Sequence, residues 1–263
     1  MHEGLVWGRL RTRLSTRTRW FAGCTFVVFI LWQGTSLAVA GCVDAATLAH
    51  STISIARYFD EAERKVHSGS LGIRGTAWFL SPTSIATAEH VAAAMALSEQ
   101  AWKQIEILDD GNRDSLAVRR LRLAGTHTEK VAVLELSRAF SAARGLELRM
   151  QPLAPEEPVV SLAYPGSHLR FAAGRFVRYG DNDRFVGTAL LEMYDGDDRL
   201  VLDHGASGAP VLDCEGRVVA VVSNLFTQTM QFPFRALRVS TAWGQPNVVS
   251  VPIQVLKDFA EAK

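Results

Sequence analysis

Short apolar runs with turn residues between them make up most of the sequence from Leu71 to the C-terminus. Many such runs at a spacing of about 8–12 residues, with few long helical patterns, indicate an all-β sandwich or barrel. A proline-rich segment, residues 152–158, divides the runs into two sets and predicts a link between two halves. The expected strands cover residues 73–80, 84–87, 104–108, 115–123, 131–136, 159–163, 171–179, 188–193, 199–202, 210–212, 217–223 and 248–251.

Three segments have helical rather than strand-like patterns. The apolar residues of segment 43–66 fall on one helical stripe, which predicts a helix packed on the outside of the main body. Residues 90–97 look like one or two helical turns, and residues 253–261 like a closing helix. Residues 68–70, Ser-Gly-Ser, then read as a linker, so we expect the main domain to begin near Leu71.

Residues 1–40 have the pattern of a targeting segment. A basic region ends at Arg19, an apolar run follows, and Ala38-Val39-Ala40 fits the small-x-small cleavage pattern of a secretory signal peptide. Two alternatives remain open. One is an uncleaved membrane anchor, and the other is acylation of Cys42, because residues 39–42 resemble the lipobox of bacterial lipoproteins. In each case we expect an exported body, periplasmic, secreted or membrane-anchored.

Composition and charge exclude several classes of function. Charged residues are 21% and hydrophobic residues 48% of the chain, as in an ordinary globular protein. Outside residues 1–40 the chain has 23 basic and 26 acidic residues. A mildly acidic body gives no support for binding to nucleic acid. Neither Cys42 nor Cys214 has a companion at metal-ligand spacing, and nothing asks for a metal or another cofactor.

Whether Cys42 is acylated decides whether Cys214 can form a disulfide with it. If Cys42 is not acylated, an exported protein could pair the two cysteines. The disulfide would close a loop of ~170 residues and stabilise the fold by about 4–5 kcal/mol. If Cys42 is acylated, Cys214 is a lone thiol in an expected hairpin turn, residues 213–216.

Small residues surround one hydroxyl in the segment Asp203-His204-Gly205-Ala206-Ser207-Gly208-Ala209-Pro210. A backbone with so little side-chain bulk can turn sharply and come close to a substrate. It can also aim the N–H groups of Gly205 and Ser207 at one point. That is the arrangement of an oxyanion hole beside a serine nucleophile.

A second motif delivers a histidine. Residues 75–80 read G-T-A-W-F-L, and a turn leads to residues 85–91, I-A-T-A-E-H-V, which contain His90. Together with the segment around Ser207, these residues resemble the trypsin/chymotrypsin-like serine peptidases, especially the bacterial Deg-type branch. The corresponding patterns there are G-T-G-F, T-A-x-H-V and G-N-S-G-G-P. The resemblance covers roughly residues 71–256, with the histidine before the serine.

The resemblance implies two packed six-stranded antiparallel β-barrels, about residues 71–155 and 156–255. The histidine lies on the first barrel and the serine at the junction. It also implies an endopeptidase that acts on a protein or peptide, with a Ser207 acyl-enzyme and His90 as general base. No region is left over for the PDZ domain that many Deg-type relatives carry.

The triad acid is where the sequence departs from this family. The acid is expected at the start of a strand reading D-x-A-V-L, but residues 130–134 read K-V-A-V-L. Lys130 cannot accept the imidazole N–H, and its charge opposes an imidazolium. Glu129 precedes it, and neighbouring side chains on a strand point to opposite faces. A bulge or turn at the strand entrance could still bring Glu129 to His90. The other candidate acids are Asp114, Asp195 and Asp203.

Two functions therefore stay open at this stage. The first is an exported serine endopeptidase. The second is a weak or inactive pseudo-peptidase that binds a peptide or a partner, since Lys130 replaces the expected acid. By family analogy Val201 would lie near the base of the specificity pocket, with Ser223 and Asn224 along one wall. We expect a small or apolar side chain to be preferred there.

Overall fold

A computed structural model describes residues 42–43, 45–98, 103–109, 112–126, 129–180, 187–194, 205–225, 227–232, 235–240 and 245–260. The expected targeting segment and the expected strand over residues 199–202 lie outside these ranges, so both remain predictions. Among the helices that the structure describes, none is both long and apolar enough to cross a bilayer.

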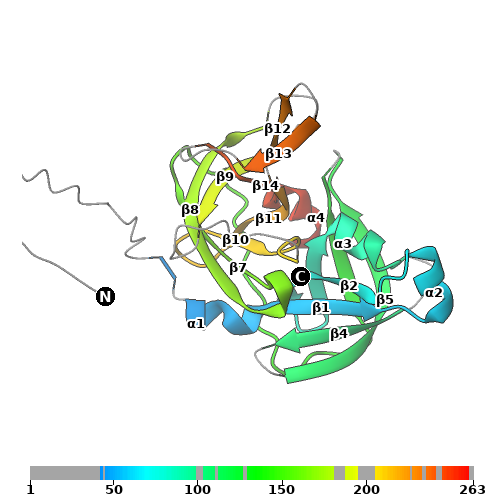
Figure 1. The fold of residues 1–263 in the computed structure, drawn as a ribbon. Coiled ribbons are helices and arrows are strands. Elements are labelled where there is room, and N and C mark those ends of the chain that lie inside the picture. Colours follow the sequence, from blue (N-terminus) through cyan, green and yellow to red (C-terminus); the bar gives the residue numbers. More distant parts are fainter. Residues whose placement is uncertain are drawn as a thin grey trace, which may run out of the picture. The chain divides into compact units, whose positions relative to one another are not determined.

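Twelve strands form two closed antiparallel barrels of six strands each, as the family resemblance predicts (Figure 1). The strand order is β1-β2-β3-β6-β5-β4 in barrel one and β10-β11-β14-β9-β8-β7 in barrel two. Barrel one consists of β1 (Thr52–Tyr58), β2 (Gly72–Ser81), β3 (Ser84–Ala88), β4 (Lys103–Asp109), β5 (Asn112–Ala124) and β6 (Val131–Leu136). Barrel two consists of β7 (Pro158–Ala163), β8 (Arg170–Tyr179), β9 (Ala189–Tyr194), β10 (Pro210–Leu212), β11 (Val218–Leu225) and β14 (Val248–Pro252).

Short helices and one extra hairpin complete the described fold. The helices expected over residues 90–97 and 253–261 are present. The first is α3 (Glu89–Ala94), and the second is a 3-10 turn, η3 (Ile253–Leu256), that continues into α4 (Lys257–Ala260). The hairpin of β12 and β13 was not predicted. The remaining elements are α1 (Ala45–Leu48), η1 (Ala49–Ser51), α2 (Glu61–Val66), η2 (Pro165–Ser167), β12 (Thr227–Phe232) and β13 (Arg235–Ser240).

The expectation of one helix over residues 43–66 is wrong. Short helices stand at both ends of this segment, but its middle is β1, which pairs with β2 and β4 in barrel one. Ile53 and Ile55 are two residues apart, which fits the period of a strand but places them on opposite sides of a helix, and β-branched residues favour the strand. Barrel one therefore begins at Thr52 rather than near Leu71, and residues 68–70 are a turn inside it.

Alternating side chains on β2 separate the core of barrel one from the junction between the barrels. Ala77 and Phe79 pack inside barrel one, whereas Trp78 and Leu80 pack in a second apolar cluster with residues of barrel two. This follows from the two-residue period of a strand. The partners of Trp78 in the junction cluster include Val160, Leu162, Leu212, Val218, Val221 and Ile253.

Thr76 joins the two barrels by hydrogen bonds at one point. Its hydroxyl donates to the carbonyl of Gly205 at 2.7 Å and accepts from the N–H of Tyr164 at 2.9 Å. Its N–H donates to the carbonyl of Ser207 at 3.0 Å, and its own carbonyl accepts from the Thr87 hydroxyl at 2.7 Å. Thr76 is fully buried, so water cannot replace these partners.

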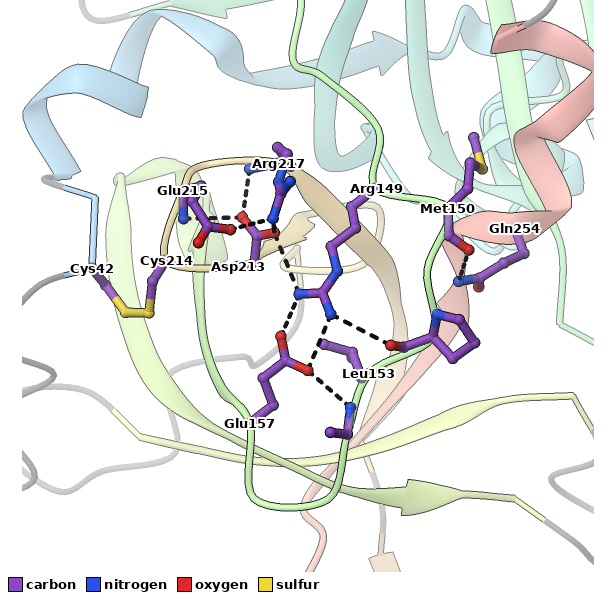
Figure 2. A network of polar contacts seen from close by, with 12 residues as sticks. Cys42, Arg149, Met150, Leu153, Glu157, Asp213, Cys214, Glu215, Arg217 and Gln254 are labelled. Atoms are coloured by element: carbon purple, nitrogen blue, oxygen red, sulfur yellow. Dashed lines mark hydrogen bonds and ion pairs between the residues drawn. A yellow bond between two sulfur atoms is a disulfide. The ribbon is translucent and has the colours of Figure 1, made fainter.

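A charged network fastens the segment between the barrels to the turn that follows β10 (Figure 2). Arg149, from that segment, is bound to the carboxylate of Glu157 and lies 3.4 Å from the carboxylate of Asp213. Asp213 also accepts the N–H of Arg217 at 2.9 Å and that of Glu215 at 3.1 Å. Burial raises the pKa of Asp213, but hydrogen bonds from Arg217 hold it below its ordinary value. The carboxylate therefore stays charged at neutral pH.

A disulfide joins Cys42 to Cys214 in the same turn (Figure 2). Of the two alternatives considered for Cys42, a disulfide or acylation, the structure has the disulfide. It joins two residues that are 172 positions apart in the sequence. Gly216 lies against the N-terminal segment, because a Cβ placed there would be 3.5 Å from Val43 and 3.8 Å from Leu48. The bond therefore ties the start of the described chain to the hairpin that leads away from Ser207.

We predict that Thr76→Val, which keeps the shape but removes the hydroxyl, destabilises the junction. The Gly205 carbonyl and the Tyr164 N–H would each lose a buried partner, at a cost of about 1–3 kcal/mol per group. Urea denaturation monitored by tryptophan fluorescence measures the loss. Thr76→Ser retains the hydroxyl and serves as the control. Equal stability of the two variants would contradict the assigned role.

We also predict that Cys214→Ser lowers the free energy of unfolding by about 2–5 kcal/mol, because the bond restricts the unfolded chain. Urea denaturation with and without dithiothreitol provides the measurement. The reductant should destabilise the native sequence to the level of Cys214→Ser and leave that variant unchanged. A native protein that is insensitive to the reductant would disprove the prediction.

Candidate active site

His90 lies in the first turn of α3, immediately after β3. The helix is fixed by its buried residues Val91 and Ala92, while His90 itself is exposed. The N–H of Glu89 donates to the carbonyl of Lys130 at 2.9 Å. This contact ties the start of α3 to the loop before β6, and that loop carries Glu129. The motif that sequence analysis singled out therefore ends in a helix that holds a histidine at the edge of barrel one.

The loop that carries Ser207 depends on glycine. Gly205 and Gly208 have φ values of +99° and +92°, which residues with a Cβ rarely adopt. A Cβ on Gly208 would lie 2.1 Å from the carbonyl oxygen of Thr76, so this position also has no room for a side chain. Ala206 and Ala209 are buried in the core of barrel two. Together these residues fix the position of the Ser207 backbone at the junction.

Ser223 links the serine loop to the candidate acid. The Ser207 hydroxyl donates to the Ser223 carbonyl at 3.1 Å, and the Ser223 hydroxyl donates to the carboxylate of Glu129. The register of β11 against β14 shifts between Val222 and Asn224, which makes Ser223 the extra residue of a bulge. Bulges are common beside active sites because they re-aim a side chain. Sequence analysis placed Ser223 on a pocket wall and did not foresee this link.

The acid candidates differ clearly in their surroundings. Glu129 has the contact with Ser223, and its charge acts on the His90 ring. Asp114 is bound instead by Arg138, whose guanidinium lies 2.7 Å from its carboxylate. Asp195 and Asp203 lie outside the described residues. Among the acids that can be compared, Glu129 is therefore the one that the fold brings toward Ser223 and His90.

The electrostatic state of His90 follows from two opposing effects. Partial removal of the ring from water lowers the pKa of His90 below its ordinary value of 6.5, whereas the charges of Glu129 and Glu89 act to raise it. Desolvation is the larger effect, so the ring is mostly neutral at pH 7. A neutral imidazole is the form that accepts a proton from a nucleophile.

Backbone donors for an oxyanion are available beside the nucleophile. Within the described residues, neither the N–H of Gly205 nor that of Ser207 donates to another protein group. The adjacent donors are occupied, because Gly208 donates to the Val222 carbonyl at 2.7 Å and Ala209 to the Ala206 carbonyl at 3.0 Å. Gly205 and Ser207 are the pair that the sequence predicted.

The predicted specificity pocket is only partly described. Val201 lies outside the described residues, Ser223 is buried, and Asn224 is exposed on β11. In the described part of the chain no group of three or more His, Cys, Asp or Glu side chains is arranged to hold a metal ion.

Sequence analysis quoted Thr76 within the motif of residues 75–80 but did not predict that Thr76 positions the loop of Ser207. The available signal was its place beside Gly75.

Comparison with known proteins gives one family match and many similar folds. The family model described as the trypsin-like peptidase domain matches residues 75–221, which is more than half of the chain. No curated protein matches the sequence. Solved structures with the same fold include active proteases and inactivated ones.

Three of these structures illustrate the range. The active form of the M. tuberculosis protease Rv3671c has a TM-score of 0.53 and 16% identity, covering 81% of this chain and 80% of that one. The scabies mite inactivated protease paralogue S-D1 has a TM-score of 0.58 and 13% identity, covering 84% and 95%. The HtrA-type protease AlgW, solved with a tripeptide, has a TM-score of 0.52 and 16% identity, covering 81% and 60%.

The matched segment runs from β2 to β11, and it contains both motifs and the junction between the barrels. With this match and two closed six-stranded barrels, the chain belongs to the family of trypsin-like peptidase domains.

Proposed function

We propose that the protein is an exported serine endopeptidase that hydrolyses peptide bonds through an acyl-enzyme on Ser207. His90 is the general base, Glu129 is its acid partner, and the N–H groups of Gly205 and Ser207 form the oxyanion hole. The observation that carries the proposal is the link through Ser223, which contacts both the nucleophile and the Glu129 carboxylate. This link holds a carboxylate, that of Glu129, at the site although Lys130 occupies the position of the expected acid.

Acylation begins when the Ser207 hydroxyl turns from the Ser223 carbonyl toward His90. The ring nitrogen accepts the hydroxyl proton while Oγ forms a bond to the substrate carbonyl carbon, and the carbonyl electron pair moves onto oxygen. The two backbone N–H groups stabilise the resulting oxyanion. Collapse of this intermediate breaks the C–N bond, and His90 returns the proton to the leaving amine.

Deacylation repeats these steps with water as the nucleophile. His90 accepts a proton from water, the hydroxide oxygen bonds to the acyl carbon, and the bond to Ser207 Oγ breaks as the proton returns to it. In both halves His90 becomes positively charged, and the Glu129 carboxylate stabilises that charge. The Ser223 hydroxyl is a positioning group, because it holds the carboxylate without touching the reacting atoms.

One observation favours a second candidate function. The Ser207 hydroxyl is bound to the Ser223 carbonyl, and within the described chain the His90 ring makes no hydrogen bond. A pseudo-peptidase that binds a peptide or a partner in its cleft would tolerate this arrangement. Catalytic hydrogen bonds are often long or poorly aligned before substrate binds and tighten in the complex, so the resting geometry is also compatible with a peptidase. Labelling of the serine distinguishes the two functions.

Export is supported by the targeting pattern and by the cysteine pair. A structural disulfide persists in an oxidising compartment and is rare in the cytosol. The bond between Cys42 and Cys214 agrees with cleavage after Ala40 and an unacylated Cys42. We propose a periplasmic or secreted body on this basis.

We predict that a fluorophosphonate probe labels the protein at Ser207 and that Glu129→Gln slows labelling strongly. Loss of the triad acid costs about 10⁴-fold in turnover in this class of enzyme, and the slower labelling should approach that size. Mass spectrometry identifies the modified residue, and time courses at several probe concentrations give the second-order rate constant.

Two variants control this experiment. Ser207→Ala should abolish labelling, and Asp114→Asn, which removes an acid engaged by Arg138, should leave the rate unchanged. A folded protein that takes up no probe between about pH 6 and 9, the range in which a histidine of this kind is neutral, would favour the pseudo-peptidase. Normal labelling of Glu129→Gln would remove Glu129 from the triad.

A further prediction concerns pH. Because desolvation lowers the pKa of His90, the labelling rate should rise with pH and reach half of its maximum below pH 6.5. In Glu129→Gln the charge that raises this pKa is gone, so the midpoint should move to still lower pH. Rates measured across a pH series provide the test. A midpoint above 6.5, or an upward shift in the variant, would contradict it.

A further inference from the structure

We propose that Arg57 and Glu63 are positioning residues for His90, because together they fix the far end of the helix that carries it. This inference rests on the proposed function in assigning His90 a catalytic role. Arg57 belongs to β1 and Glu63 to α2, the short helix in the connection between β1 and β2 (Figure 1). Neither residue belongs to the motifs around His90 and Ser207.

The Arg57 guanidinium is buried and makes contacts on three sides. Only 6% of the residue is exposed. One nitrogen, Nη1, donates to the carbonyl of Met95 at 2.9 Å, and the other, Nη2, donates to the carboxylate of Glu63. The guanidinium also lies 5.3 Å from the centre of the Phe59 ring. A planar group with a fixed fork of donors can hold two acceptors in one relative position.

Met95 directly follows the last residue of α3 and is its C-cap. The helix has only six residues, Glu89–Ala94, so its direction depends strongly on how each end is held. The Glu89 N–H fixes the first end through the Lys130 carbonyl at 2.9 Å. Arg57 fixes the other end through the Met95 carbonyl, and the Met95 side chain is fully buried. His90 lies between these two attachments.

Glu63 stabilises, by its charge, the attachment of Arg57 to the Met95 carbonyl; we call this attachment the clamp. Glu63 binds Arg57, and the ammonium of Lys103 on β4 lies 3.5 Å from the same carboxylate. The hydrogen bond from Arg57 lowers the pKa of Glu63 to about 2, so the carboxylate is ionised at neutral pH. Without this charge, two cations would face each other and a buried guanidinium would lose its counterion, which is strongly unfavourable.

Glu63→Gln is a clean probe of this charge. Glu63 also forms a capping box with Asp60, whose N–H donates to the Glu63 side chain at 3.2 Å. Glutamine is accepted in the same box, so the variant should keep α2 while it removes the charge. Glu61→Gln is the matched control on the same helix, since Glu61 is exposed and makes only a long contact with Lys65 at 4.0 Å.

A second pair of variants tests whether the planar arrangement of the Arg57 guanidinium donors is needed. Arg57→Lys keeps the positive charge but cannot hold the Met95 carbonyl and the Glu63 carboxylate in one planar geometry. Arg64→Lys is its control, because the Arg64 side chain donates to the carbonyl of Phe59 at 3.0 Å and, among the described residues, makes no hydrogen bond to α3. Thermal denaturation should show that all four variants are folded before the comparison is made.

The first measurement does not need activity. The ring of His90, assigned by comparison with His90→Gln, is titrated by NMR in each variant. The carboxylates that act on this ring are Glu89 and Glu129. If α3 loosens, the ring becomes more hydrated, so its pKa should rise toward 6.5 in Glu63→Gln and Arg57→Lys but not in the two controls. Equal titration curves in all four variants would overturn the proposal.

The second measurement is the rate of probe labelling at Ser207. A misplacement of about 1 Å can cost up to about 100-fold, so we expect Glu63→Gln and Arg57→Lys to slow labelling by about tenfold or more. A changed titration with unchanged labelling would show that the clamp does not position the base, and would also overturn the proposal. If the native protein itself takes up no probe, the proposed function fails, and the titration alone decides whether the clamp holds His90.

Discussion

Three hydrogen bonds of Thr76 across the junction are the constraint on which the rest of the site depends. They join a strand of barrel one to the carbonyls of Gly205 and Ser207 and to Tyr164 at the start of the second barrel's first turn. Because Thr76 is fully buried, these groups have no alternative partner in water. The nucleophile therefore keeps its place only while the two barrels stay together.

Around that junction, each of the proposed catalytic groups is supported from a different direction. Ser207 is held by tight glycine turns, Glu129 by the Ser223 hydroxyl, and His90 by a helix attached at both ends. The supports of Glu129 and of α3 come from distant parts of the sequence, Ser223 and Arg57, whereas the glycines that shape the Ser207 loop are its near neighbours. In a site assembled in this way, an acid can come from a loop residue other than the expected one. Under the proposed function, Glu129 takes the role that the family pattern gives to the position of Lys130.

The relatives with this fold show why the fold alone does not decide activity. An active protease and an inactivated protease paralogue have similar TM-scores to this chain. What distinguishes a working site is the geometry of a few polar groups, here the orientation of the Ser207 hydroxyl and the contact of Glu129 with Ser223. A fold comparison does not measure the orientation of single side chains.

The sequence by itself determined an all-β fold, the motifs around His90 and Ser207, and the pair of cysteines that could bond. The all-β class follows from local strand and turn signals, whereas the two six-stranded barrels were expected only from the family resemblance that the motifs carry. Sequence analysis misread β1, because the apolar residues of segment 43–66 were grouped together as one helical stripe, although Ile53 and Ile55 have the two-residue spacing of a strand that pairs with β2. Only the tertiary structure decided that Glu129 reaches Ser223, since a bulge in a distant strand aims that hydroxyl. Contacts between residues far apart in sequence leave no periodic signal.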